Sequence, residues 1–476
     1  MDTLELLKKY DVPGPRYTSY PTVPIWSETI GIEDYKNSLQ RISSQDNISL
    51  YFHIPFCENR CHFCGCTRFH TQDKSLSAPY ADTLINELNS ICSHISSFGP
   101  SAPACRVEAS SEDGRPIGPS VSQIHFGGGS PNFLKPEELS KIMNKVRELF
   151  TILPDAEIAI EMNPKMSSKE FCENLYREGF NRISIGVQDF NDSVQKLINR
   201  NQSYDVTKSF IDDLRTIGFK HFNFDLVYGL PGQTIDNFSY TLEKTKELNP
   251  NRLAVYSFAL VPWAHPEQRS FKNEEVPSPE TKVTLFEIAH DFFTKNGFHL
   301  IGMDHFARED DELYQASKNN TIHRNFMGYS TRAEAHQIGV GASSISYVAG
   351  NYFQNQKNVC QYQTLIAENS LATCKGFKLS QDDHIRRDFI TKLMCDYTVD
   401  ITNFSKQHAI TFKDYFADDL LLLKEFIDDN LIELTPTHLT VTKQGHFVVR
   451  NMAMCFDKYL EEIKKTARNP VFSRTV

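Results

Sequence analysis

Long apolar runs are missing from this sequence of 476 residues. No stretch approaches the roughly 18 uninterrupted apolar residues that a membrane-spanning helix needs, so we expect no membrane segment. The opening MDTLELLKKYDVPGPRY also lacks the basic region and apolar run that are typical of a secretory signal. Together these absences predict a cytoplasmic protein.

An excess of positive charge is missing as well. The chain has 50 lysines and arginines against 60 aspartates and glutamates, which gives a formal net charge of −10. Broad binding to nucleic acid or to an anionic membrane is therefore not expected. If the ligand is itself an acid, positive charge has to be concentrated locally, so the positions of individual arginines become informative.

A G-x-G-x-x-G motif for dinucleotides is absent, although strand-like runs and segments of helical period alternate along the chain. Such alternation predicts a parallel sheet with helices outside it. We expect an α/β fold, a partial (β/α)6 barrel, in which ligands gather at the carboxyl ends of the strands. The six expected strands cover residues 48–56, 122–131, 157–164, 182–188, 222–231 and 252–260.

Changes in composition predict three parts. Residues 1–47 form an N-terminal extension, residues 48–375 the barrel domain, and residues 376–476 a mainly helical, winged-helix-like domain. This last domain has no basic recognition stripe, so we expect a structural lid and not a DNA-binding module. Residues 93–121 are rich in Ser, Pro and Gly and predict a surface insertion, in which Cys105 is incidental.

Four cysteines fall within ten positions of the stretch FHIPFCENRCHFCGC: Cys57, Cys61, Cys64 and Cys66. The total of eleven cysteines is odd, and most stand singly, which favours a reducing compartment and excludes a disulfide staple. Zinc usually takes two well-separated pairs of ligands, and this trio has no distant partner pair. A [4Fe–4S] cube takes each thiolate on a different iron, and three ligands leave one iron open to a small molecule.

The spacing C-x-x-x-C-x-x-C resembles that of radical S-adenosylmethionine enzymes, and further motifs extend the resemblance along the chain. The whole pattern is similar to the oxygen-independent coproporphyrinogen III oxidases, which belong to that class. The family has Thr at the position of Ser130. The motifs are PGPRYTSYP (13–21), YFHIPFCENRCHFCGC (51–66), GFNRISIGVQDFN (179–191), FDLVYGLP (224–231), LIGMDHFAR (300–308), HRNFMGYST (323–331) and RNMAMCFDKYL (450–460).

The resemblance implies oxidative decarboxylation of two propionates of coproporphyrinogen III to vinyl groups, giving protoporphyrinogen IX. It implies one [4Fe–4S] cluster, held by Cys57, Cys61 and Cys64, and two S-adenosylmethionine molecules. The residues that would contact the first molecule are Tyr51, Gly128, Glu161 and Ile345. The residues that would contact the second are Phe63, Gly129, Ser130, Gln188, Arg200, Asp225 and Ala259.

Four arginines lie in loops rich in Gly, His and aromatic residues: Arg16, Arg308, Arg324 and Arg332. Arginine suits carboxylates because its planar fork donates two parallel hydrogen bonds. Arg16 ranks first, since the family's N-terminal segment closes over the site, and we expect it to be catalytic together with Tyr51 and Glu161. A structural ion pair is the alternative fate of each arginine.

Two other functions compete with the oxidase. A related radical S-adenosylmethionine branch acts as a haem chaperone, but it lacks the CGC ending and the GPRYTSYP segment that this chain has. A non-catalytic iron–sulfur regulator would use the C-terminal domain on DNA, against the acidic charge balance. For the oxidase we expect a monomer with a donor such as flavodoxin or ferredoxin and an unknown electron acceptor.

Overall fold

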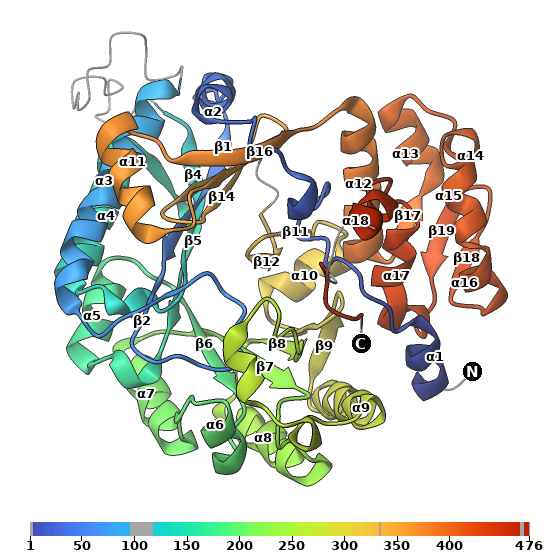
Figure 1. Cartoon of the computed structure of the whole chain (residues 1–476), viewed down its shortest axis with the longest axis horizontal. Helices are drawn as coiled ribbons and strands as arrows, with labels where there is room; N and C mark the ends of the chain where they lie inside the picture. The colour runs from blue at the N-terminus through green and yellow to red at the C-terminus, as the bar shows by residue number, and fades with distance from the viewer. Residues whose placement is uncertain (1–2, 96–117, 333–334, 467–470, 476) are drawn as a thin grey trace.

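The computed structural model describes residues 3–95, 118–332, 335–466 and 471–475, and its centre is one curved twelve-stranded sheet (Figure 1). Six parallel strands follow one another in the sheet in chain order, and β13 adds a parallel strand beside β1. In order across the sheet, the strands are β16 (Thr373–Lys378), β15 (Asn351–Asn355), β14 (Ile345–Val348), β13 (His336–Val340), β1 (Asn47–Ile54), β4 (Ser120–Gly128), β5 (Thr151–Met162), β6 (Arg182–Gln188), β7 (His221–Tyr228), β8 (Arg252–Ser257), β10 (His305–Arg308) and β9 (Phe298–Ile301).

The six expected strands are β1, β4, β5, β6, β7 and β8, and the predicted α/β fold of radical S-adenosylmethionine type is confirmed. The sheet is wider than six strands because β14 to β16 extend one edge and β10 and β9 extend the other, all in antiparallel pairing. These flanking strands are short, and their patterns did not distinguish them from loops.

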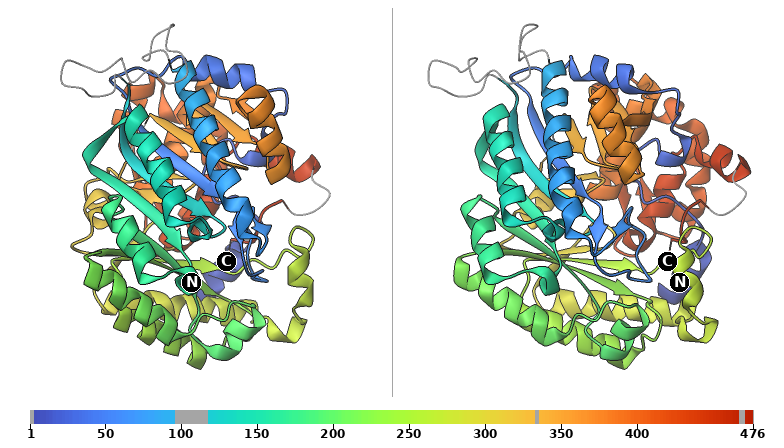
Figure 2. Two further views of the ribbon diagram at one scale, coloured as in Figure 1. Left: turned by 90° about the vertical axis from the view of Figure 1, so that its left-hand side faces the viewer. Right: turned by 60° about the vertical axis from the view of Figure 1, so that its left-hand side comes forward.

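Helices cover the outer face of the sheet, as Figure 2 shows. On β1, the alternate residues Leu50, Phe52 and Ile54 are fully buried in the core shared with these helices. Successive strand residues point to opposite faces, so Ser49, Tyr51 and His53 face the inside of the barrel. The covering helices are α3 (Ser77–His94), α4 (Pro136–Leu149), α5 (Lys169–Arg177), α7 (Tyr204–Ile217), α8 (Ile235–Leu248), α9 (Pro279–Lys295) and α11 (Val359–Asn369). Two short helices pack in smaller clusters of their own: α6 (Asp192–Leu197) and, against β9 and β10, α10 (Glu312–Lys318).

A buried network of charged residues closes the floor of the barrel, at the amino ends of the strands. Arg182 donates to Glu157 at 2.7 Å and to Glu312 at 2.9 Å, and Arg252 donates to Asp311 at 2.7 Å. Burial alone would raise the pKa of Glu157, but the two arginines hold it well below its usual range. The floor is therefore sealed by paired charges, and the open end of the barrel is the carboxyl end of the strands.

The C-terminal part has its own hydrophobic core, to which α1 (Thr3–Tyr10) contributes Leu6, Leu7 and Tyr10. Figure 1 shows α1 beside this part, and Lys8 of α1 pairs with Glu280 of the barrel helix α9 at 2.9 Å. A small sheet of order β17–β19–β18 joins the helices, which matches a mainly helical domain with a hairpin. Its elements are α12 (Gln381–Asp396), β17 (Thr398–Asp400), α13 (Ile401–His408), α14 (Phe412–Tyr415), α15 (Ala417–Leu422), α16 (Lys424–Asp428), β18 (Ile432–Leu434), β19 (His438–Val441), α17 (Val449–Met454) and α18 (Leu460–Thr466).

The segment that follows residue 411 forms three short helices, α14, α15 and α16, and not one long helix. The chain bends at Phe416 and Leu423, both of which are fully buried in the C-terminal core. Leu421 and Leu422 between them are 73% and 61% exposed. Phe416 and Leu423 are seven positions apart and so lie on one side of the segment, which faces the core, while the intervening leucines lie outside.

The predicted insertion, residues 93–121, falls largely on residues 96–117, which lie outside the described residues together with Cys105. At its edges, α3 continues to His94 and β4 begins at Ser120. Between α1 and the barrel, the N-terminal segment passes a cis Tyr20–Pro21 bond and reaches α2 (Ile32–Leu39). None of the helices in the described ranges combines the length and apolar character that a membrane span needs.

Candidate active site

The three cysteines lie in the loop that follows β1, at the carboxyl end of the barrel. Cys57 ends the short strand β2 (Phe56–Cys57), which pairs with β3 (Phe69–His70) and so closes the loop at its base. Arg68 was not singled out from the sequence, yet its guanidinium donates to the carbonyl oxygens of Cys64 at 2.7 Å and Cys61 at 3.3 Å. It thus holds the cysteine backbone from inside the loop.

The thiols differ in their surroundings. Burial raises the pKa of Cys57 to about 11, whereas a hydrogen bond from Cys66 lowers the pKa of Cys64 to about 6. The Cys66 thiol has its pKa raised by the same interaction. Nη1 of Arg200 lies 3.8 Å from the sulfur of Cys61. Guanidinium groups beside a thiolate cluster favour the ionised form that iron requires.

No three His, Cys, Asp or Glu side chains converge on a single point within the described residues, as one zinc ion would require. A [4Fe–4S] cube does not need that convergence, because each thiolate ligates a different iron. The three predicted ligands, Cys57, Cys61 and Cys64, all line one cavity, and Cys66 lines it as a fourth cysteine. Cys66 is hydrogen-bonded to Cys64 and is not one of the three predicted ligands.

The glycine run after β4 packs against the base of the cysteine loop. Gly129 donates to the carbonyl of Ile54 at 2.8 Å, and Ser130 donates to that of Phe56 at 2.9 Å. Gly128 has φ +119°, a region that side chains rarely adopt, and its N–H donates to Glu161 at 3.1 Å. The missing side chains thus let this backbone approach the cysteine loop and Glu161 at the same time.

Glu161 ends β5 within a group of inward-facing polar side chains. Its other carboxylate oxygen lies 3.2 Å from Nε2 of His125, and the His125 ring stacks on Tyr51 at 5.9 Å. The Tyr51 hydroxyl contacts Nδ1 of His53 at 3.0 Å. Both histidines were missed in the sequence, although alternation along β1 and β4 places them on the face that carries Tyr51.

Gln188, Arg200 and Asp225 meet on the far side of the same cavity. Gln188 has φ +69° at the end of β6, next to a register shift, and its side chain lies over Gly186. Arg200 donates to the Gly186 carbonyl, and its Nε is buried without a partner in the described structure. Burial, reinforced by the charge of Glu161, raises the pKa of Asp225 to about 7.

Most of the predicted cofactor residues line one cavity of about 160 Å³. Three predicted residues do not line the cavity. Tyr51 is connected to it by its ring contact with His125, which in turn contacts the lining residue Glu161. Ala259 lies in the loop after β8, and Ile345 is the first residue of β14. Those that line it are Cys57, Cys61, Phe63, Cys64, Gly128, Gly129, Ser130, Glu161, Gln188, Arg200 and Asp225. Strands far apart in sequence thus deliver the predicted groups to one place.

Arg16 does not line this cavity and lies next to Tyr256, near the carboxyl end of β8. Its guanidinium pairs with Asp304 and lies over the ring of Tyr256, 5.3 Å from its centroid. Its backbone carbonyl accepts from Nε of Arg324 at 3.3 Å. Arg450 donates to the carbonyls of Gly14 and Pro15, so it anchors the segment that presents Arg16.

Two other candidate arginines lie elsewhere. Arg308 pairs across from Phe298 at the edge of the sheet, and its N–H donates to Asn251, just before β8 begins. This is the amino end of β8, opposite the cavity, so Arg308 does not face the cofactor residues. Arg332 donates to the side chain and carbonyl of Asp155, near the start of β5. Arg332 therefore forms a structural ion pair, the alternative to binding a substrate carboxylate.

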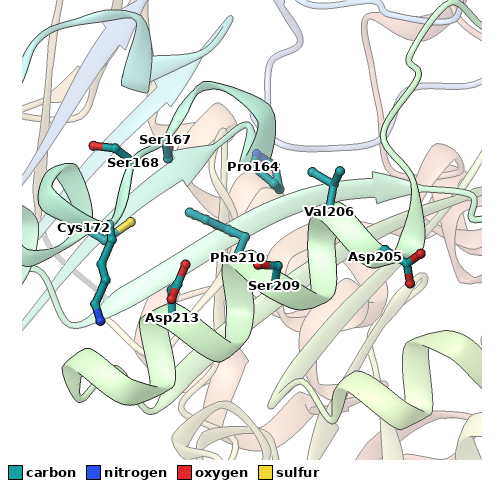
Figure 3. A pocket seen from close by; sticks show the side chains of 10 residues that line it. Pro164, Ser167, Ser168, Cys172, Asp205, Val206, Ser209, Phe210 and Asp213 are labelled. Carbon is teal, nitrogen blue, oxygen red and sulfur yellow. The ribbon is translucent and has the colours of Figure 1, made fainter.

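A second hollow of about 390 Å³ lies outside the barrel, between α5 and α7 (Figure 3). Figure 3 shows Phe210 at its base, with Cys172 on α5 and the carboxylates Asp205 and Asp213 along α7. It shares no residue with the cavity at the strand ends, so it belongs to the outer helical layer.

Comparisons with known proteins agree with this geometry. Residues 51–245 match the Radical SAM superfamily model, and residues 379–448 match the HemN C-terminal domain model. The chain is 40% identical over 473 residues to the oxygen-independent coproporphyrinogen III oxidase of Escherichia coli, covering 99% of this chain and 98% of the relative. This chain belongs to the oxygen-independent coproporphyrinogen III oxidase family.

Other members of the oxidase family extend the match. The Synechocystis enzyme is 37% identical over 99% of this chain and 97% of its own length, and the Pseudomonas aeruginosa enzyme is 35% identical over 99% and 98%. The solved structure of coproporphyrinogen III oxidase from Escherichia coli, described as a radical SAM enzyme, superposes with a TM-score of 0.87 at 38% identity. It covers 96% of this chain and 98% of that one.

Membership confirms the predicted family and class of cofactor: radical S-adenosylmethionine enzymes use a [4Fe–4S] cluster and S-adenosylmethionine. The three relatives above carry the oxidase name, and neither competing function, haem chaperone or iron–sulfur regulator, appears in those names. The predicted roles of individual residues remain predictions, as do the domain boundaries and the monomeric state.

Proposed function

We propose that this protein is an oxygen-independent coproporphyrinogen III oxidase, which converts two propionates of coproporphyrinogen III into the vinyl groups of protoporphyrinogen IX. The observation that carries the proposal is the cavity that joins three cysteines to Glu161 and Asp225 at the strand ends, in a chain of the oxidase family. Each conversion removes one hydrogen from the propionate β-carbon, releases CO2 and passes one electron to an acceptor.

The cofactors define the chemistry that the protein has to accommodate. When bound, the reduced cluster and S-adenosylmethionine supply a 5′-deoxyadenosyl radical that takes the hydrogen. Cys57, Cys61 and Cys64 hold the cluster in this proposal, and Arg68 keeps their loop in place by its bonds to two of the cysteine carbonyls.

The first S-adenosylmethionine is assigned to Tyr51, Gly128, Glu161 and Ile345. Glu161 offers carboxylate oxygens to ribose hydroxyls, while Gly128 brings backbone close to the methionine part. In the structure His125 and the Gly128 N–H already orient this carboxylate. Gly339 on β13 is paired with Tyr51 and lies against the Ile345 backbone, so one strand, β13, separates Ile345 on β14 from Tyr51 on β1.

The second S-adenosylmethionine is assigned to groups mostly on the opposite wall. Arg200 suits its carboxylate, since one of its nitrogens is buried without a partner in the described structure. Phe63 offers an aromatic face for the adenine and packs beside Val227 and Phe258. The complete set is Phe63, Gly129, Ser130, Gln188, Arg200, Asp225 and Ala259.

Arg16 is assigned to the propionate that reacts. It lies next to Tyr256, whose raised pKa follows from burial and then from the charge of Asp225. A guanidinium there can hold a carboxylate with two parallel bonds, in exchange for its bond to Asp304.

Turnover tests the function directly. Anaerobic enzyme, supplied with reductant, S-adenosylmethionine, an electron acceptor and coproporphyrinogen III, is expected to form protoporphyrinogen IX by way of a tricarboxylic intermediate. CO2 and 5′-deoxyadenosine should be released in step with each decarboxylation. Arg16→Ala should slow this turnover and leave the cluster spectrum unchanged. Cleavage of S-adenosylmethionine with an untouched tetrapyrrole and tight haem binding would refute the proposal in favour of a haem chaperone.

The electron donor is proposed as a flavodoxin or ferredoxin, since the reaction requires a low-potential reductant for the cluster. Titrating each reduced donor against turnover at fixed substrate tests this assignment. A rate that saturates with one donor and stays at background with the other identifies it.

A further inference from the structure

A larger cavity of about 490 Å³ lies between the barrel and the C-terminal part. We call it the α12 pocket, because one face of α12 forms a wall with Arg387, Asp388, Lys392 and Asp396. Its volume is in the range of ligand sites, roughly 300–1,000 Å³. The predicted cofactor residues do not line it.

The α12 pocket reaches the inner face of the barrel, nearer to the amino ends of the strands than the cofactor cavity. Ser49 lines it, and Ser49 shares the inward face of β1 with Tyr51, two residues or about 7 Å along the strand. Gln337 on β13, paired with Ser49, lines it as well. A molecule that reacts at the cofactor cavity and extends toward the barrel floor would therefore place its distant groups here.

Arg324 links the two cavities. It lines the α12 pocket, is only 9% exposed, and donates from Nε to the carbonyl of Arg16. Its guanidinium lies 4.5 Å from the centre of the Tyr329 ring. Among the described residues its Nη1 is buried without a hydrogen-bond partner, and the bond from its Nε goes to a backbone carbonyl and not to a carboxylate. A buried guanidinium without an anion is costly unless a ligand supplies one.

The other charged groups of the pocket leave it cationic. Arg387 lies over the ring of Tyr347 at 4.3 Å, Lys392 lines the pocket from the same helix, and Arg332 lines it while paired with Asp155. The two carboxylates on that helix face are Asp388, which pairs with Arg387 and His408, and Asp396. Burial raises the pKa of Asp396 to about 6, so it adds less than a full negative charge near that pH.

We infer that the α12 pocket binds the two propionates that the substrate keeps, with Arg324 as their principal partner and Lys392 as a second cation. The inference rests on the proposed function, because only a tetrapyrrole with four propionates has two that react and two that remain. Arg324 would be a positioning and specificity residue: it fixes which side of the macrocycle faces the radical, while Arg16 holds the reacting group.

Binding of two oxidised porphyrins to the cluster-loaded enzyme with S-adenosylmethionine separates these roles. Coproporphyrin III carries all four propionates, whereas protoporphyrin IX carries only the retained pair, and neither can react. Arg324→Gln should weaken both by a similar factor, about 10- to 100-fold by fluorescence titration, because a charge-assisted bond to a retained carboxylate is lost in each. Arg324→Lys should recover part of the affinity.

Arg308→Gln is the matched control, since that arginine lies at the opposite end of β8, and it should bind both porphyrins as wild type does. Lys392→Gln, on the half-buried face of α12, is a second probe that does not disturb the buried arginine, and it should also weaken both. Wild-type affinity for both porphyrins in Arg324→Gln and Lys392→Gln would overturn the inference.

A loss confined to coproporphyrin III would also overturn it, because it would place Arg324 at a reacting propionate. If Arg324→Gln loses its cluster spectrum, the Lys392→Gln result alone decides. Failure of the proposed function looks different: wild-type enzyme would then leave coproporphyrinogen III unconverted, whatever the porphyrin affinities are.

Discussion

Replacing Gly129 with alanine would place a methyl group 2.6 Å from the carbonyl oxygen of Pro55 and 2.7 Å from that of Phe56. Both contacts are with backbone, so no side-chain rotation can relieve them and the main chain has to move. Overpacking of this kind costs about 1–3 kcal/mol. The backbone that must move, at Pro55 and Phe56, leads directly into Cys57. The substitution is therefore expected to shift the cysteine loop relative to the glycine run.

Two measurements follow from this magnitude. Thermal unfolding of the Gly129→Ala protein should show a Tm lowered by roughly 1 to 3 °C, because the unfolding entropy of a chain this long is about 1 kcal/mol per degree. S-Adenosylmethionine affinity of the reconstituted enzyme should fall by about 5- to 150-fold if the full strain is expressed in binding.

Gly65→Ala is the matched control for this change. It lies in the same cysteine loop, and its added methyl would meet nothing closer than the His265 ring at 3.5 Å, an ordinary contact. It should keep the wild-type Tm and the cluster spectrum. If Gly129→Ala also matched wild type in both Tm and cofactor affinity, the argument that the missing side chain permits the backbone approach would be wrong.

Cys64→Ala should abolish the [4Fe–4S] absorption after anaerobic reconstitution, whereas Cys66→Ala should keep it; a lost cluster in the Cys66 variant would refute the three-ligand assignment. Equilibrium binding to wild-type enzyme should reveal two S-adenosylmethionine sites, of which Gln188→Ala weakens one; a single wild-type site with an intact cluster would contradict the two-molecule proposal. The pKa of Asp225 is raised in the folded protein to about 7 from an ordinary value of 3.8, so the folded state binds the extra proton and stability is lost as pH rises from about 4 to 7. Without S-adenosylmethionine, Asp225→Asn should therefore have a higher Tm than wild type at pH 8, by a margin that shrinks toward pH 5; a margin independent of pH would count against the buried, protonatable carboxyl.

The sequence by itself determined the alternating strands and helices of the barrel. Apolar strand runs and helical periods identified the six parallel strands because burial imposes a period of 2 on a strand and 3.6 on a helix. The cysteine spacing is likewise local: three thiolates that serve one cluster have to lie on one short loop, so their identity can be read from the chain. Arg68, in contrast, acts on the carbonyls of that loop, and nothing in its sequence position reveals this.

The tertiary structure decided which distant residues meet. Arg16, Arg308, Arg324 and Arg332 look alike in sequence, each in a loop with Gly, His or aromatic neighbours. Arg308 lies at the amino end of β8, and Arg332 is paired with Asp155. Only the fold brings Arg16 and Arg324 into contact beside the strand ends.

The physical reason is that the role of a charged side chain depends on its partner and its burial, and both come from packing between segments that lie far apart in the sequence. Arg324 and the Arg16 carbonyl that accepts its hydrogen bond are separated by 308 positions. Periodicity records which face of one element is buried, but not which loop of another element will lie against it. The chemistry of the cluster loop was therefore determined by sequence, and the arrangement of arginines that would select the propionates was decided by the fold.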